Sequence, residues 1–128
     1  MLGIAAGMVG VASSQATDAT PVADTLDGAY AVIRQYVTAV NADVDELISK
    51  VAGGYVPIIS AVDGFLLYTI VYNTETRAWT AIAYFTSHDG ADASTAAAAD
   101  FVVSANLASY FEAPKPVVTD GGVIITAP

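Results

Sequence analysis

The order in which two hydrophobic periodicities alternate along the chain constrains its fold more than any other feature of the sequence. Four segments rich in Val, Ile, Phe and Tyr are typical of β-strands: 29–38, 64–73, 78–87 and 116–127. Two segments with apolar residues three and four positions apart are typical of helices: 41–62 and 89–111. The order βαββαβ predicts the ferredoxin-like α+β fold, in which two helices cover one face of a four-stranded antiparallel sheet.

The first predicted helix should be interrupted in its second half. Gly53-Gly54 lowers helix propensity and Pro57 lacks a backbone donor, so we expect a bend or break between residues 52 and 57. The second part of the helix is expected to bury Tyr55, Ile58 and Ile59. The glycine pair lacks the Gly-Lys-Ser/Thr ending of a phosphate loop and follows a helix, so it predicts no nucleotide site.

Local signals mark the ends of several elements. Asp63-Gly64 predicts the turn into the second strand, and the polar segment 74–77 predicts a hairpin between strands two and three. Asp89 and Asp92 resemble a capping pair at the start of the second helix. The segment 120–122, Asp-Gly-Gly, is interpreted as a β-bulge in the last strand.

Strands two and three are expected to be apolar on both faces. The alternation places one set of apolar side chains on each face: Phe65, Leu67 and Val71 against Leu66, Tyr68, Ile70 and Tyr72, and Trp79, Ala81, Ala83 and Phe85 against Ile82 and Tyr84. The helices can cover only one face. The sequence therefore predicts a homodimer with sheets stacked face to face; the alternative is that these are tightly buried central strands.

The charge balance excludes some partners. The chain has a net charge of −9 and only four basic residues, Arg34, Lys50, Arg77 and Lys115, so its field repels phosphate backbones and anionic membranes. No cysteine is present, which excludes thiolate chemistry and Cys-based zinc sites. The acids at 43, 45 and 46 lie at the start of a helix, where the dipole favours them, and predict no metal site.

The first 27 residues form a separate region of the predicted organisation. An apolar run over residues 1–12, too short to span a bilayer at about 20 residues, precedes small and polar residues. This order is typical of a secretory signal with a cleavage site near 14–16, Ser-Gln-Ala; the alternatives are a mobile apolar tail in a cytoplasmic protein or a retained membrane tether. We expect a signal-like segment and linker at 1–27, a domain at 28–128, and export to the cell surface or beyond.

Three stretches together resemble a known family. The stretches "YAVIRQY", "GGYVPIISAVDGFLLY" and "YFTSHDGADAS" are similar to those of antibiotic-biosynthesis-monooxygenase-like proteins of the dimeric α+β barrel superfamily, over about residues 28–127. The resemblance implies a homodimer with a cavity between sheet and helices, used in relatives for cofactor-free oxygenation of aromatic polyketides or for haem degradation. Haem-degrading relatives carry asparagine, tryptophan and histidine where this chain has Arg34, Phe85 and Ser94, so the resemblance does not extend to haem and no cofactor is indicated.

The candidate ligand-binding residues are those with a polar or aromatic group on the predicted strands or at their ends: Arg34, Tyr36, Tyr68, Trp79, Phe85 and His88. Arg34 interrupts an apolar strand, so it must reach an acid of its own chain or of a partner, solvent, or an anionic ligand. His88 beside Asp89 could form a catalytic dyad, although a solvated residue at a helix start is the expected outcome. The tyrosines and Trp79 could instead serve only the core and the dimer contact.

Three function classes remain. The first is a dimer that binds a small apolar or aromatic ligand, or is purely structural, without catalysis. The second is a cofactor-independent monooxygenase acting on an aromatic or polyketide-like substrate, which requires a base in the cavity. The third is a membrane-tethered accessory protein, which requires the apolar N-terminal run to be retained.

Overall fold

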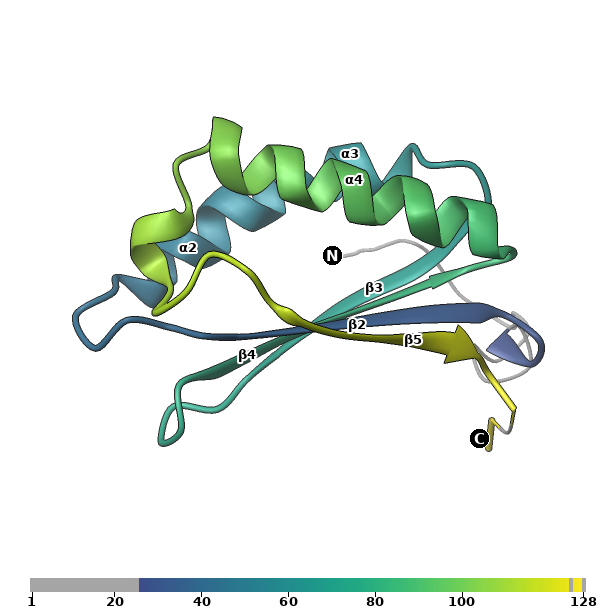
Figure 1. Ribbon diagram of the computed structural model, residues 1–128, viewed down its shortest axis with the longest axis horizontal. Helices are drawn as coiled ribbons and strands as arrows, with labels where there is room; N and C mark the ends of the chain where they lie inside the picture. Colours follow the sequence, from purple (N-terminus) through teal and green to yellow (C-terminus); the bar gives the residue numbers. More distant parts are fainter. Residues whose placement is uncertain (1–25, 125, 128) are drawn as a thin grey trace, which may run out of the picture. The chain divides into compact units, whose positions relative to one another are not determined.

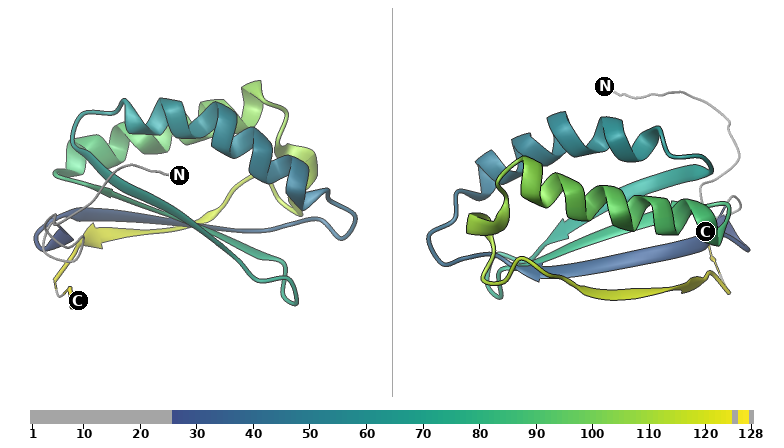
Figure 2. Two further views of the ribbon diagram at one scale, coloured as in Figure 1. Left: turned by 180° about the vertical axis from the view of Figure 1, so that it is seen from behind. Right: turned by 45° about the horizontal axis from the view of Figure 1, so that its top comes forward.

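Four antiparallel strands form one sheet in the order β3-β4-β2-β5, and the helices cover one of its faces (Figures 1 and 2). The strands are β2 (Tyr30–Val37), β3 (Phe65–Tyr72), β4 (Ala78–Phe85) and β5 (Val117–Gly122). The connection between β3 and β4 is a hairpin, and each of the two remaining connections contains a helix. The chain therefore has the ferredoxin-like α+β fold, as the order of periodicities predicted.

The computed structural model describes residues 26–124, 126 and 127, and residues 28–124 form one unit of the chain. The predicted signal-like run and its cleavage site lie outside the described residues. Within the described ranges, no helix combines the length and the apolar character needed to cross a bilayer.

The first helix changes geometry in its middle, where the glycine pair predicted an interruption. It begins as α2 (Val44–Lys50), widens into a π-helical turn, η2 (Val51–Tyr55), and ends as α3 (Val56–Ser60). In the wide turn the N–H of Val56 bonds to the carbonyl of Val51, five residues back. The Asp43 carboxylate caps the helix by accepting from the N–H of Glu46 at 3.0 Å, which accounts for one of the acids at its start.

The buried residues of this helix recur at every fourth position: Leu47, Val51, Tyr55 and Ile59. An α-helix turns by about 100° per residue, so four-residue steps would drift around a regular helix by about 40° each. The π-helical turn absorbs one residue and returns Ile59 to the side of Leu47. The expectation that Ile58 is buried is wrong: it is 44% exposed.

At Gly54 and Gly64, among other glycines, a Cβ would come too close to a neighbouring side chain. A Cβ on Gly54 would lie 2.8 Å from the Phe101 ring of α4 (His88–Ser104), whereas one on Gly53 would meet nothing within 4 Å. Gly64 has a φ of +82° at the turn into β3, and a Cβ there would lie 2.4 Å from Thr86 Oγ1. The turn predicted at Asp63-Gly64 is therefore confirmed.

The boundaries of the second helix differ from those predicted. Ser87 is its N-cap and accepts from the N–H of Gly90 at 3.4 Å, so the capping pair predicted at Asp89 and Asp92 is wrong. The helix ends at Ser104, and Asn106 follows with a φ of +56°. A separate 3₁₀ turn, η3 (Ala108–Tyr110), occupies part of the range expected to be helical.

The bulge in the sheet lies on a different strand from the predicted one. Asp120, Gly121 and Gly122 pair with β2 in unbroken register, and β5 ends there. The register instead shifts between Phe65 and Leu67 in β3. Because the extra residue reverses the alternation, Phe65 lies on the helix side of the sheet, opposite Phe85, and not on the side of Leu67 as expected.

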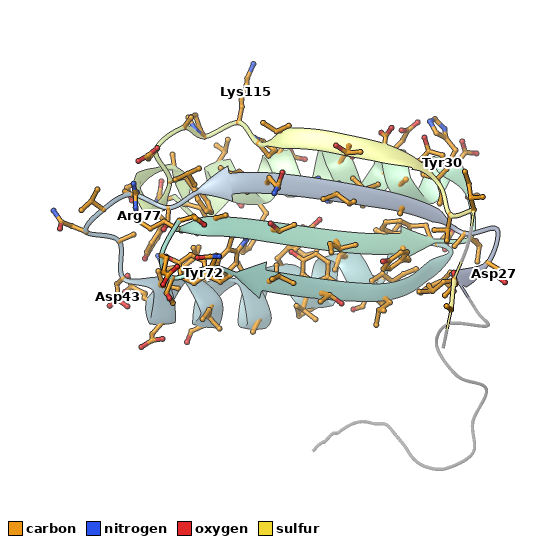
Figure 3. The ribbon with its side chains drawn as sticks, turned by 90° about the horizontal axis from the view of Figure 1, so that it is seen from below. Asp27, Tyr30, Asp43, Tyr72, Arg77 and Lys115 are labelled. Atoms are coloured by element: carbon orange, nitrogen blue, oxygen red, sulfur yellow. The ribbon has the colours of Figure 1, made fainter. Side chains whose placement is uncertain are left out.

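The face of the sheet away from the helices carries no charged side chain on any of its four strands. We call this the outer face; the view in Figure 3 looks onto it. Strand pairing places on it Ala31, Ile33, Gln35, Val37, Leu67, Thr69, Val71, Ala78, Thr80, Ile82, Tyr84, Val117, Thr119 and Gly121. Among its aliphatic residues, Val71 and Val117 are 54% and 70% exposed, so the unit of residues 28–124 presents apolar side chains to water here.

Candidate functional site

The space between sheet and helices contains three neighbouring cavities that share lining residues. A central cavity of about 40 Å³ lies over β2 and β4. An α4-side cavity of about 330 Å³ lies between α4 and the segment 114–118, and an α2-side cavity of about 210 Å³ lies between the first helix, β3 and β4. Arg34 and Tyr36 line both the central and the α4-side cavity, whereas Tyr68 and Trp79 line both the central and the α2-side cavity.

Arg34 is the charged residue at the centre of this site. It projects from β2 to the helix side and is only 3% exposed. Its Nη2 donates to Ser94 Oγ at 3.0 Å and to Thr95 Oγ1 at 2.8 Å on α4. Both hydroxyls in turn donate to the carbonyl of Ala91, at 2.7 and 3.2 Å, so their lone pairs face the guanidinium. The helix thus holds two neutral acceptors against the cation.

Among residues 26–124, 126 and 127, no carboxylate forms an ion pair with Arg34. The two ion pairs found there join Arg77 to Glu112 and His88 to Asp92. The ion pair expected with an acid of its own chain is therefore not found in the part of the chain that the structure describes. Neutral hydroxyls compensate a buried cation less well than a carboxylate does, so the charge costs stability where it lies.

Aromatic side chains surround the guanidinium. The Tyr36 ring stacks on Phe111, with centroids 4.3 Å apart and an angle of 25° between the planes. Tyr55 lies edge-on to Tyr68 at 5.6 Å, and its hydroxyl donates to the carbonyl of Ser94 at 3.3 Å. The walls are flat and largely apolar, with phenol groups near the charge, as in sites for aromatic molecules.

The cavity phenols stay protonated at neutral pH. Burial raises the pKa of Tyr36, Tyr55 and Tyr68 above the ordinary value of 10, and the opposing effect of the Arg34 charge is smaller. Neutral phenols can donate hydrogen bonds to a ligand. Within the described residues, no carboxylate or imidazole lines any of the three cavities.

The structure brings four of the six predicted site residues together: Arg34, Tyr36, Tyr68 and Trp79 line the central cavity. Phe85 does not line it, since it is fully buried at the other end of β4 and lies edge-on to Phe65 at 6.0 Å. His88 does not line it either: its side chain is 59% exposed and its Nδ1 lies 3.3 Å from Asp92 Oδ2. The carboxylate beside His88 is thus that of Asp92 and not Asp89. The binding roles of the four remaining residues stay predictions.

Sequence reasoning missed Tyr55 and Thr95 as parts of this site. Tyr55 was assigned to the core, where it lies, but its hydroxyl reaches the backbone beside Arg34. The sequence-based predictions include Ser94 only as the residue at the position where haem-degrading relatives carry histidine. Ser94 and Thr95 form a pair of hydroxyl residues directly before the alanine run of α4. Such a pair, on a helix that covers a strand containing an arginine, is the sequence signal that could have indicated the hydrogen bonds to Arg34.

Several solved structures share this fold at low sequence identity, including the following three. A monooxygenase from Streptomyces coelicolor, in complex with nanaomycin D, matches with a TM-score of 0.66 at 20% identity, covering 85% of this chain and 98% of that one. A dimeric ferredoxin-like protein from an uncultured marine organism matches with 0.62 at 12%, covering 82% and 96%. A protein of unknown function from Nitrosomonas europaea matches with 0.62 at 13%, covering 80% and 96%.

These likenesses define the class of fold. The chain is a ferredoxin-like α+β protein similar in structure to antibiotic-biosynthesis-monooxygenase-like proteins, which confirms the expected resemblance at the level of the fold. No family model and no curated protein matches the sequence.

Proposed function

We propose that this protein binds a small aromatic molecule in the cavities between its sheet and its helices, without catalysing a reaction. The observation that carries the proposal is Arg34, a buried cation held by neutral hydroxyls and surrounded by aromatic rings. A purely structural role gives no reason to keep an unneutralised charge in the core, whereas a ligand could supply the missing partner.

The size of the site supports a ligand of one or two rings. The α4-side cavity of about 330 Å³ lies at the lower end of the roughly 300–1,000 Å³ range of small-molecule sites. The central cavity shares Arg34 and Tyr36 with it and is also lined by Trp79 and Tyr68, whose rings offer flat surfaces for stacking.

A cofactor-independent monooxygenase remains the alternative, and the cavity does not favour it. Such an enzyme must remove a proton from its substrate before oxygen reacts, which requires a group that is basic near neutral pH. No carboxylate or imidazole lines the cavities in the described residues, and burial raises the pKa of the cavity tyrosines. The activity of the Streptomyces coelicolor neighbour therefore does not by itself transfer to this chain.

We also propose that the protein is a homodimer whose two copies pack through their outer faces. This face lacks charge on all four strands and exposes aliphatic side chains, so a second copy of the same face would be a complementary cover. A structural neighbour from an uncultured marine organism is a dimeric ferredoxin-like protein, which supports a dimer but does not identify its interface.

The single tryptophan of the chain provides the test of ligand binding. Trp79 is 3% exposed and lines the central cavity, so its fluorescence should change when an aromatic compound enters. We expect saturable quenching or enhancement by naphthalene derivatives. Ala98→Phe would place a ring where both the central and the α4-side cavity have a wall and should weaken binding, whereas Ala93→Phe, on an exposed position of the same helix, should not. An unchanged signal with every aromatic probe would overturn the proposal.

A further inference from the structure

Resting on the proposed function, we infer that the ligand is an aromatic acid: its ring lies in the α4-side cavity and its carboxylate meets Arg34. The inference depends on the position of the guanidinium, the distribution of basic residues and the contrast between the two larger cavities.

Some N–H donors of the Arg34 guanidinium are not used by the described residues. Both of its hydrogen bonds to described residues come from Nη2, so the Nη1 and Nε groups have no acceptor in this part of the chain. Arg34 lines both the central and the α4-side cavity, so a ligand in either cavity would lie beside its side chain. A guanidinium is a planar fork that matches the two oxygens of a carboxylate, and such charge-assisted pairs are stronger than neutral hydrogen bonds.

Two of the four basic residues of this acidic chain line the same cavity. Lys115 precedes β5 at the edge of the sheet and lines the α4-side cavity, but its side chain extends away from the sheet (Figure 3). Arg77 and Lys50 are engaged elsewhere, the first with Glu112 at 3.0 Å and the second over the Tyr110 ring at 5.2 Å. Arg34 is thus the buried cation of the α4-side cavity in a protein of net charge −9, and no acid among the described residues lines this cavity.

The remaining walls of the α4-side cavity suit the ring of such an acid. They consist of small aliphatic side chains and two prolines: Ala98, Ala99, Val102, Val103, Val118, Pro114 and Pro116. Tyr36 lines the same space, and because burial raises the pKa of its phenol, it can donate a hydrogen bond beside Arg34. The α4-side cavity therefore offers apolar walls for a ring and, at Arg34, hydrogen-bond donors for an anion.

The α2-side cavity does not share this character. Its lining residues are apolar or aromatic, and none is charged: Ile48, Val51, Ala52, Val56, Tyr68, Ile70 and Trp79. An acid placed there would lose its hydration without gaining a cation. The carboxylate is thus assigned to the other side of the central cavity.

A matched pair of probes tests the inference by titration calorimetry. Naphthalene carboxylate and its uncharged amide have nearly the same shape, so the difference between their affinities reports the charge. We expect the acid to bind at least about tenfold more tightly than the amide, because a charge-assisted hydrogen bond contributes more than a neutral one. Arg34→Met should abolish this preference and keep the amide affinity, whereas Lys50→Met, with the same charge change outside the cavities, should preserve it.

The outcomes separate this inference from the proposed function. Equal affinities of acid and amide for the unaltered protein would overturn the inference and leave aromatic binding intact. Binding of neither probe would refute both. If Arg34→Met fails to fold, Arg34→Lys keeps a charge but loses the fork; we expect its preference for the acid to shrink, and an undiminished preference would contradict carboxylate pairing at Arg34.

Discussion

Arg34 on β2 and Ser94 on α4 are 60 residues apart in the chain and are joined by a hydrogen bond of 3.0 Å from Nη2 to Oγ. This bond crosses the space between the sheet and its helix layer. It satisfies one guanidinium donor but leaves the positive charge without a counter-ion among the described residues.

Replacing Arg34 with methionine should make the ligand-free protein more stable. Methionine fills a similar volume without a buried charge, and the Ser94 and Thr95 hydroxyls keep their bonds to Ala91, so the free energy of unfolding should rise by about 1 kcal/mol or more. Urea unfolding measures the change. A loss of stability would show instead that the guanidinium supports the fold.

The two glycines of the π-helical turn should respond in opposite ways to alanine. Gly54→Ala should lower the free energy of unfolding by about 1–3 kcal/mol, because its Cβ would lie 2.8 Å from the Phe101 ring. Gly53→Ala meets open space and should raise the free energy by up to about 1 kcal/mol through helix propensity. Thermal melts of both variants test this, and equal shifts would contradict the close approach of α4.

A charge on the outer face should separate the dimer. Ile82 lies opposite Ile33 near the middle of this face, and Ile82→Asp would bury a carboxylate between the two sheets at a cost of several kcal/mol. Light scattering should then report the monomer mass at micromolar concentration. Val40→Asp, at a position 75% exposed outside the sheet, should remain dimeric. A monomeric unaltered protein would contradict the proposed interface.

Stability should fall at alkaline pH because of the cavity tyrosines. Burial raises the pKa of Tyr68, Tyr55 and Tyr36 in the folded state, so above about pH 10 the unfolded state releases protons first and gains stability relative to the folded state. The free energy of unfolding, measured in urea, should be constant through neutral pH and decline as pH rises above 10. Tyr68→Phe should make the decline shallower; an unchanged decline would show that Tyr68 does not contribute.

The fold was predictable because its signals are local. Apolar side chains alternate along residues 78–85, and buried residues recur at every fourth position before and after the glycine pair. Both patterns can be recognised within a short stretch of sequence. The bulge was misplaced because Asp-Gly-Gly carries a strong turn signal, whereas Phe65-Leu66-Leu67 carries none. Its position is set by packing, which turns Phe65 toward Phe85.

The candidate site was predictable only in part because it depends on contacts between distant residues. An arginine in an apolar strand indicated that some partner was needed, but α4 supplies two hydroxyls where an acid was expected. Phe85 and His88 lie close in sequence to the β4–α4 junction, yet that junction is at the far end of β4 from Trp79. No sequence pattern distinguishes the two ends of the strand.

The π-helical turn also identifies a position where the length of this chain could change. A chain lacking one residue between Val51 and Tyr55 would run as a regular α-helix and still present the same four side chains to the core, because the wide turn absorbs one residue. Insertions and deletions in most helices rotate everything beyond them. Here a single-residue deletion would preserve the orientation of Ile59 and convert the wide turn into a regular one.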